Sequence, residues 1–146
     1  EIDRTYPKIN LMSWWGRQTA FAISTAYEED GELDRAISIL QRSLTTPRWM
    51  KATRYSDTDE DVRLLVRLGA LYSRKQDSPK ALASLLKALE INDSYGETYY
   101  YLGVEYAKQG LKEKAAENYR KALDANVKGA KARLEELDQP NARGMK

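Results

Sequence analysis

Apolar residues recur at helical spacing along most of the chain, and the pattern is clearest between residues 96 and 125. It predicts a helix over 96–108, whose apolar face carries Tyr99, Leu102, Gly103 and Tyr106. Gly110 interrupts the pattern and predicts a turn. A second helix is predicted over 112–125, and its inward-facing residues are Ala115, Tyr119, Ala122 and Leu123. The segment is therefore predicted to form an antiparallel helix pair.

The same pattern occurs 34 residues earlier. Identical residues at this separation are the pairs Leu68 and Leu102, Gly69 and Gly103, Tyr72 and Tyr106, Ala81 and Ala115, Ala88 and Ala122, and Leu89 and Leu123. A less regular copy lies upstream and keeps the internal spacing at Tyr27, Gly31, Ala36 and Leu40. The 45 residues from Ala36 to Ala81 equal one 34-residue repeat plus an 11-residue insertion, predicted at about 47–58. Repetition at this period indicates an array of helical repeats.

Small residues occupy the points where the two helices of each pair are expected to meet. Gly69 and Gly103 lie on the first helices, and Ala81 and Ala115 lie on the second helices. A large side chain at these points would push the helices apart, because packed interiors tolerate little added volume. These residues predict a close approach within each pair.

The ends of the helices also carry signals. Ser78 is predicted to be the N-cap of the second helix in the middle copy, with Pro79 at the first helical position. After the last copy, one more amphipathic helix is predicted from the spacing of Val127, Ala130, Leu134 and Leu137. Such a helix would cover the last repeat, which a stack of repeats needs for solubility.

This pattern resembles the tetratricopeptide repeat (TPR) family, whose motif runs aromatic, Leu-Gly, Tyr, Ala, aromatic, Ala. The last copy matches it at Tyr99, Leu102, Gly103, Tyr106, Ala115, Tyr119 and Ala122. The earlier copies depart from it at Leu65, Leu85, Ala20 and Ser24. Over about 17–127, the resemblance implies an all-α fold: an α-solenoid of three helix–turn–helix repeats in a right-handed superhelix, plus a C-terminal capping helix. The first helix of each repeat would line a concave groove.

The expected organisation follows from the repeats. A TPR domain over 17–137 is preceded by an N-terminal segment, 1–16, and followed by a tail, 138–146. Within it we expect repeats at about 17–46, 61–94 and 95–127, the insertion at about 47–58, and the capping helix at about 128–137.

Composition narrows the functional classes. The net charge of +2, from 24 basic and 22 acidic residues, argues against a dedicated nucleic-acid binder. The chain has no Cys and no His, which removes disulfides, thiol nucleophiles, Ser-His-Asp triads and nearly all zinc sites. No Gly-rich phosphate loop and no convincing pair of carboxylates is present. We therefore expect no enzyme activity, no cofactor and no metal site. No run of about 18 apolar residues occurs, so no transmembrane segment is expected.

The resemblance places the partner-binding surface on the inner face of the first helices. The residues expected there are Phe21, Thr25, Arg63, Arg67, Arg74, Glu97, Tyr100, Tyr101 and Lys108, with Trp49 of the insertion at the edge. Arg63, Arg67 and Arg74 fall within about 40° of one another around a helix and form a basic stripe. Beside the two tyrosines, this stripe predicts a groove for an acidic, partly hydrophobic peptide. The alternative is that these are ordinary solvated arginines, with Asp59 and Arg63 forming an i,i+4 pair.

Two further expectations concern specificity. The family members that clamp the C-terminal carboxylate of chaperones use Lys and Asn at positions that here hold Phe21, Thr25, Arg67 and Ala70. The sequence therefore argues against chaperone-tail binding. The three Trp residues, Trp14, Trp15 and Trp49, lie outside the repeat pattern. They are interpreted either as an N-terminal cap packed on the repeats or as a partner or membrane-surface contact.

Taken together, the sequence predicts a non-catalytic protein–protein interaction module or assembly scaffold. The alternative is an accessory TPR domain or subunit of a larger enzyme or membrane-associated complex, since the chain begins at Glu1 rather than Met. The expected partner is a protein or peptide, and self-association stays open. The compartment is not decided between cytoplasm and periplasm.

Overall fold

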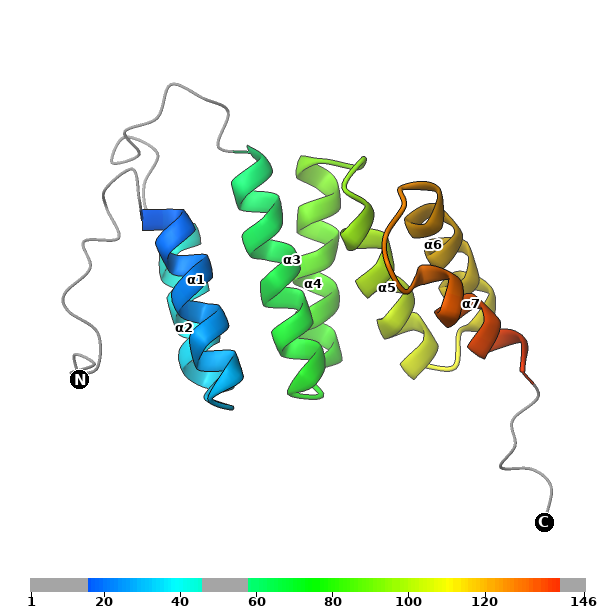
Figure 1. Cartoon of the computed structure of the whole chain (residues 1–146), viewed down its shortest axis with the longest axis horizontal. Coiled ribbons are helices and arrows are strands. Elements are labelled where there is room, and N and C mark those ends of the chain that lie inside the picture. The colour runs from blue at the N-terminus through cyan, green and yellow to red at the C-terminus, as the bar shows by residue number, and fades with distance from the viewer. Residues whose placement is uncertain (1–15, 46–57, 140–146) are drawn as a thin grey trace, which may run out of the picture. The chain divides into compact units, whose positions relative to one another are not determined.

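The structure is a computed structural model that describes residues 16–45 and 58–139, and all regular elements in these ranges are helices. The helices are α1 (Gly16–Glu29), α2 (Leu33–Thr45), α3 (Thr58–Arg74), α4 (Ser78–Ile91), α5 (Gly96–Lys108), α6 (Lys112–Asp124) and α7 (Ala130–Asp138). Figure 1 shows that α1 and α2, α3 and α4, and α5 and α6 form antiparallel pairs. The chain divides into two compact units, Glu1–Leu64 and Leu65–Lys146, with the boundary inside α3. None of the described helices is both long and apolar enough to cross a membrane.

The predicted close approach within the helix pairs of the second unit is confirmed. A Cβ added to Gly103 on α5 would lie 2.6 Å from Cδ1 and Cε1 of Tyr119 on α6. A Cβ added to Gly69 on α3 would lie 2.7 Å from Cγ of Leu85 on α4. Ala81 and Ala115 are fully buried. Glycine thus lets a large side chain of the second helix lie directly on the backbone of the first.

The first helix of every pair ends in the same way. A residue with a left-handed backbone follows the helix, and the next N–H closes the turn by donating to the carbonyl of the repeat tyrosine. These bonds run from Glu32 to Tyr27 (2.8 Å), from Asp77 to Tyr72 (2.9 Å) and from Leu111 to Tyr106 (2.9 Å). The left-handed residues are Gly31, Gln76 and Gly110, with φ of 79°, 65° and 76°. The middle copy therefore places a side chain where the other two have glycine.

Replacing Gln76 with Gly should raise the free energy of unfolding by about 0.5 to 1 kcal/mol. The left-handed conformation costs a residue with a Cβ about 1 kcal/mol or more, and glycine avoids most of this cost while losing some chain entropy. The reverse change, Gly110→Ala, should destabilise by about 1 kcal/mol, since no atom lies within 4 Å of the added Cβ and only the backbone conformation opposes it. Urea unfolding followed by circular dichroism would measure both. Equal midpoints for all three proteins would contradict the assignment of the turn.

The repeat tyrosines are also covered in a repeated way that the sequence analysis did not identify. A cation eight positions later, on the second helix of the pair, lies over each ring. The distances to the ring centroids are 5.8 Å for Arg35 over Tyr27, 5.6 Å for Lys80 over Tyr72 and 5.7 Å for Lys114 over Tyr106. Cation–π contacts of this length stabilise modestly at exposed sites. The three cations therefore have a structural role within the pairs.

The prediction of Ser78 as an N-cap is wrong by one residue. The N-cap of α4 is Asp77, whose Oδ1 accepts from the backbone N–H of Lys80 at 3.2 Å, while Ser78 is the first helical residue. This N–H and the Lys80 ammonium hold the pKa of Asp77 below its ordinary value. The error arose because Ser and Asp are equally good caps and stand side by side here.

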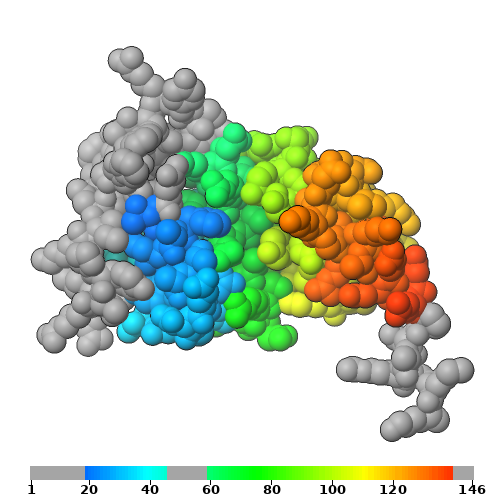
Figure 2. Space-filling view, viewed as in Figure 1, coloured from blue at the N-terminus to red at the C-terminus, as the bar shows by residue number. Residues whose placement is uncertain are grey.

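α7 covers the end of the last pair. Ala130, its first residue, is fully buried, whereas Leu134 and Leu137 are half-buried. In the space-filling view, the residues of α7 lie directly against those of α5 and α6 (Figure 2). The amphipathic helix predicted at the end of the repeats is thus present, and it begins after a turn that contains Val127.

Candidate functional site

Three of the predicted binding residues meet in the first unit. The guanidinium carbon of Arg63 lies 5.0 Å from the ring centroid of Phe21, a cation–π contact. The hydroxyl of Thr25 donates to the backbone carbonyl of Phe21 at 3.0 Å. Phe21 and Thr25 are half-buried and Arg63 is exposed. The first unit thus presents an aromatic ring with an arginine over it.

The other two arginines of the predicted stripe differ in exposure. Arg67 is half-buried and its Nε is fully enclosed, whereas Arg74, in the last turn of α3, is exposed. Both belong to the second unit. Arg63, Arg67 and Arg74 all lie on α3, as the predicted stripe requires, but their exposure to solvent differs.

On α5, Tyr100 and Tyr101 form an aromatic pair. Their ring centroids are 5.3 Å apart and their planes are nearly perpendicular, an edge-to-face arrangement that favours contact. The Tyr100 ring also lies 5.9 Å from that of Tyr119, which is buried. Burial raises the pKa of Tyr119 to about 12. Tyr100 and Tyr101 are each half-buried, so both rings present area to a partner, and Glu97 stands exposed at the start of the same helix.

Lys108 lies in a cluster that the sequence analysis did not predict. Its Nζ donates to the backbone carbonyl (2.9 Å) and to the hydroxyl of Ser73 at the end of α3, and lies 3.3 Å from Oε1 of Glu105. Glu105 is fully buried, and its Oε2 has no hydrogen-bond partner within the described residues. Lys108 therefore neutralises a buried carboxylate and joins α5 to α3. The sequence carried one signal, since Glu105 directly precedes Tyr106 in the apolar pattern of α5 and is three residues before Lys108.

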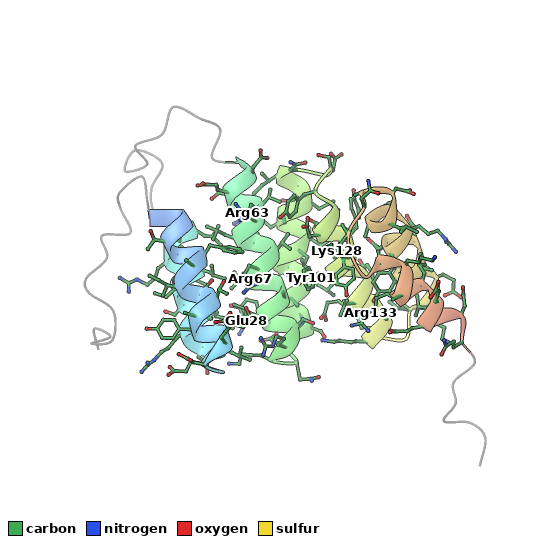
Figure 3. All side chains as sticks on the ribbon, viewed as in Figure 1. Glu28, Arg63, Arg67, Tyr101, Lys128 and Arg133 are labelled. Carbon is green, nitrogen blue, oxygen red and sulfur yellow. The ribbon has the colours of Figure 1, made fainter. Side chains whose placement is uncertain are left out.

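α7 adds a second arginine site. Nε of Arg133 donates to the hydroxyl of Tyr100 at 3.4 Å, and Nη1 pairs with Glu136 at 2.9 Å. The Tyr100 hydroxyl and the Glu136 carboxylate raise the pKa of Arg133 above its ordinary value, so the side chain stays cationic. Figure 3 shows Tyr101, Lys128 and Arg133 in the same area of the second unit. No residue of α7 was predicted from the sequence to bind a partner, because this helix was interpreted only as a cap.

The last predicted contact cannot be placed, because Trp49 lies outside the described residues, as do Trp14 and Trp15. The remaining candidates fall into two groups. The first unit holds Phe21, Thr25 and Arg63, and the second holds Arg67, Arg74, Glu97, Tyr100, Tyr101 and Lys108. The charges differ between the units: residues 65–146 contain 15 Lys and Arg and 11 Asp and Glu, whereas residues 1–64 contain 9 and 11.

Comparison with protein families gives matches along the repeats. Residues 62–95 and 96–126 match a family model described as tetratricopeptide repeat, and residues 19–52 match a second model of the same description. A search of curated protein sequences finds no match.

Solved structures share the fold. The first TPR domain of human RPAP3 has 20% identity and a TM-score of 0.70, with 86% of this chain and 92% of that chain covered. The C-terminal TPR-containing domain of a putative FK506-binding protein of Plasmodium falciparum has 20% identity and a TM-score of 0.67, with 91% of each chain covered. PcrH of Pseudomonas aeruginosa, in complex with the chaperone binding region of PopB, has 15% identity and a TM-score of 0.64, with 92% of this chain and 99% of that chain covered.

Proposed function

Because the chain belongs to the tetratricopeptide repeat family, we propose that it is a non-catalytic interaction module that binds an acidic, partly apolar peptide segment. The binding surface would be the exposed side of the first helices, α3 and α5, in the second unit. Two similar structures hold a segment of a partner protein: PcrH is seen with the chaperone binding region of PopB, and the first TPR domain of Spaghetti (RPAP3) with an HSP90 peptide, SRMEEVD. Function on a shared fold depends on the surface residues, so the chemistry of the peptide follows from the side chains that this chain exposes.

The observation that carries the proposal is the half-exposed pair Tyr100 and Tyr101 in a unit with a basic excess. Tyrosine provides a large contact area at low cost in side-chain entropy, which is why it is enriched in interfaces. Arg74 is exposed on α3, and arginine binds carboxylates in a two-pronged geometry. An apolar side chain against the tyrosines and a carboxylate beside the arginine would satisfy both features.

Lys108 is expected to contribute less to peptide binding than the sequence predicts. Its ammonium already contacts Glu105 and Ser73, so a partner would have to share it with a buried carboxylate. The binding energy is therefore assigned mainly to Tyr100, Tyr101 and the arginines.

A fluorescein-labelled peptide in which Glu alternates with Leu and Phe should bind the chain in fluorescence anisotropy, and the same peptide with Lys in place of Glu should not. Changing Arg67 and Arg74 together to Glu should weaken binding of the acidic peptide by about tenfold or more, because attraction becomes repulsion. The matched control reverses two exposed charges on second helices, Lys87→Glu with Arg120→Glu, and should change the affinity by less than about threefold. Equal binding of the two peptides, or equal loss in both variants, would sink the proposal.

A further inference from the structure

α7 has polar contacts that covering the last repeat does not require. Arg133 reaches back to the hydroxyl of Tyr100 on α5 and pairs with Glu136 one turn further along α7. These two contacts hold the guanidinium at the edge of the aromatic pair. The third nitrogen, Nη2, makes no hydrogen bond or ion pair to any described residue, and close to half of the side chain is exposed. A fixed, partly exposed arginine next to aromatic rings is typical of a residue that binds carboxylates.

The turn before α7 lies against the same tyrosine. Gly129 has a φ of 86° and packs next to Tyr100. A Cβ added to Gly129 would lie 3.6 Å from the Tyr100 hydroxyl. The left-handed backbone excludes most side chains at this position. Lys128 directly precedes it, is exposed, and makes no ion pair or hydrogen bond within the described part of the chain. Lys128 thus directly precedes the glycine that contacts Tyr100, and Arg133 donates to the hydroxyl of the same tyrosine, so this segment brings two cations to the Tyr100 region.

We propose that α7 and the turn before it are part of the binding surface, and that Lys128 and Arg133 bind a carboxylate of an acidic peptide whose neighbouring apolar side chain packs on Tyr100 and Tyr101. This inference rests on the proposed function and extends it to a helix that neither the repeat motif nor the predicted stripe includes. The occupant is an acidic peptide because both cations are exposed and the rings beside them offer apolar area. Glu136 already pairs with Arg133 and would compete with the incoming carboxylate.

The test uses the full chain and the fluorescein-labelled Glu, Leu and Phe peptide. Lys128→Gln with Arg133→Gln should weaken binding by about tenfold, since two charge-assisted contacts are lost. The matched control, Lys87→Gln with Arg120→Gln, removes the same charge from exposed sites in the same unit and should change binding by less than about twofold. Circular dichroism melting would establish that all variants fold.

A second variant separates a binding role of α7 from a structural one. Glu136→Gln removes the carboxylate that competes for Arg133, so the peptide should bind about two- to threefold more tightly. If α7 only covers the last repeat, losing this ion pair would leave the affinity unchanged or lower it. The inference is overturned if Glu136→Gln does not bind the peptide more tightly than the parent. It is also overturned if Lys128→Gln with Arg133→Gln binds the peptide as tightly as the parent.

The same measurements distinguish the inference from the proposed function. If the peptide depends on Arg67 and Arg74 but not on Lys128 and Arg133, the inference fails and the proposed function stands. If the chain does not prefer the acidic peptide over its Lys counterpart, the proposed function fails, and the inference fails with it.

Discussion

Replacing Gly103 with Val should lower the free energy of unfolding by about 3 kcal/mol. Any Cβ at this position would lie 2.6 Å from two ring atoms of Tyr119, and the two γ-methyl groups would add to the overlap. The ring has little room to move, because Tyr119 is 2% exposed and packs against the backbone of α5 at Gly103 and against the ring of Tyr100. Overpacking of a tight core costs about 1 to 3 kcal/mol and more where neighbours cannot shift, which places this change at the upper end. Urea unfolding monitored by circular dichroism would measure it.

Gly103→Ala and Ala83→Val complete this experiment. The alanine should cost less, about 1 to 2 kcal/mol, since its better helix propensity returns about 1 kcal/mol of the steric penalty. Ala83 is exposed in the middle of α4, so its change to Val should cost only the difference in propensity, about 0.6 kcal/mol or less. If Gly103→Val is no more harmful than Ala83→Val, the close approach of α5 and α6 does not depend on glycine.

The repeat pattern predicted these close approaches because they depend on residue size alone. The contact of Gly103 with Tyr119 and the contact of Gly69 with Leu85 are separated by one repeat. The same small residue therefore has the same packing role in both pairs. The predicted helix over 96–108 has the observed bounds, and the one predicted over 112–125 ends one residue earlier, at Asp124. The tyrosine–cation contacts recur equally regularly, but the sequence did not predict them for Arg35, Lys80 and Lys114, because the repeat motif is defined mainly by small and apolar residues.

The candidate site was less predictable, because polar contacts depend on distances between helices. The angular spacing of Arg63, Arg67 and Arg74 is a property of one helix and could be calculated. The contact of Lys108 with Ser73 on α3 could not be calculated in this way. The contact of Arg133 on α7 with Tyr100 on α5 could not be calculated either. A periodic pattern indicates which side of a helix a residue occupies, whereas its partner on the next helix requires the structure.

Replacing Lys108 with Met should destabilise the second unit by about 2 kcal/mol. Lys108 is the cation that the structure places against the fully buried Glu105, whose other oxygen, Oε2, has no hydrogen-bond partner among the described residues. Removing one partner of a buried ion pair costs about 3 to 5 kcal/mol, because the remaining charge stays out of water. The Lys108 side chain is 38% exposed. Water that takes the place of its ammonium group would therefore solvate Glu105 and offset part of that cost. Chemical unfolding would measure the change, and hydrogen exchange would locate it at the ends of α3 and α5.

Two variants show whether the buried carboxylate is the cause. Adding Glu105→Leu to Lys108→Met removes both charges and should restore stability to within about 1 kcal/mol of the parent, since apolar side chains replace a buried pair at little cost. Lys121→Met removes the lysine of an exposed pair, 3.1 Å from Glu117, and should cost less than about 0.5 kcal/mol. A Lys108→Met protein as stable as Lys121→Met, or one that Glu105→Leu fails to rescue, would show that Glu105 does not need the charge of Lys108. In that case Lys108 would be available to a partner peptide, as the sequence predicts.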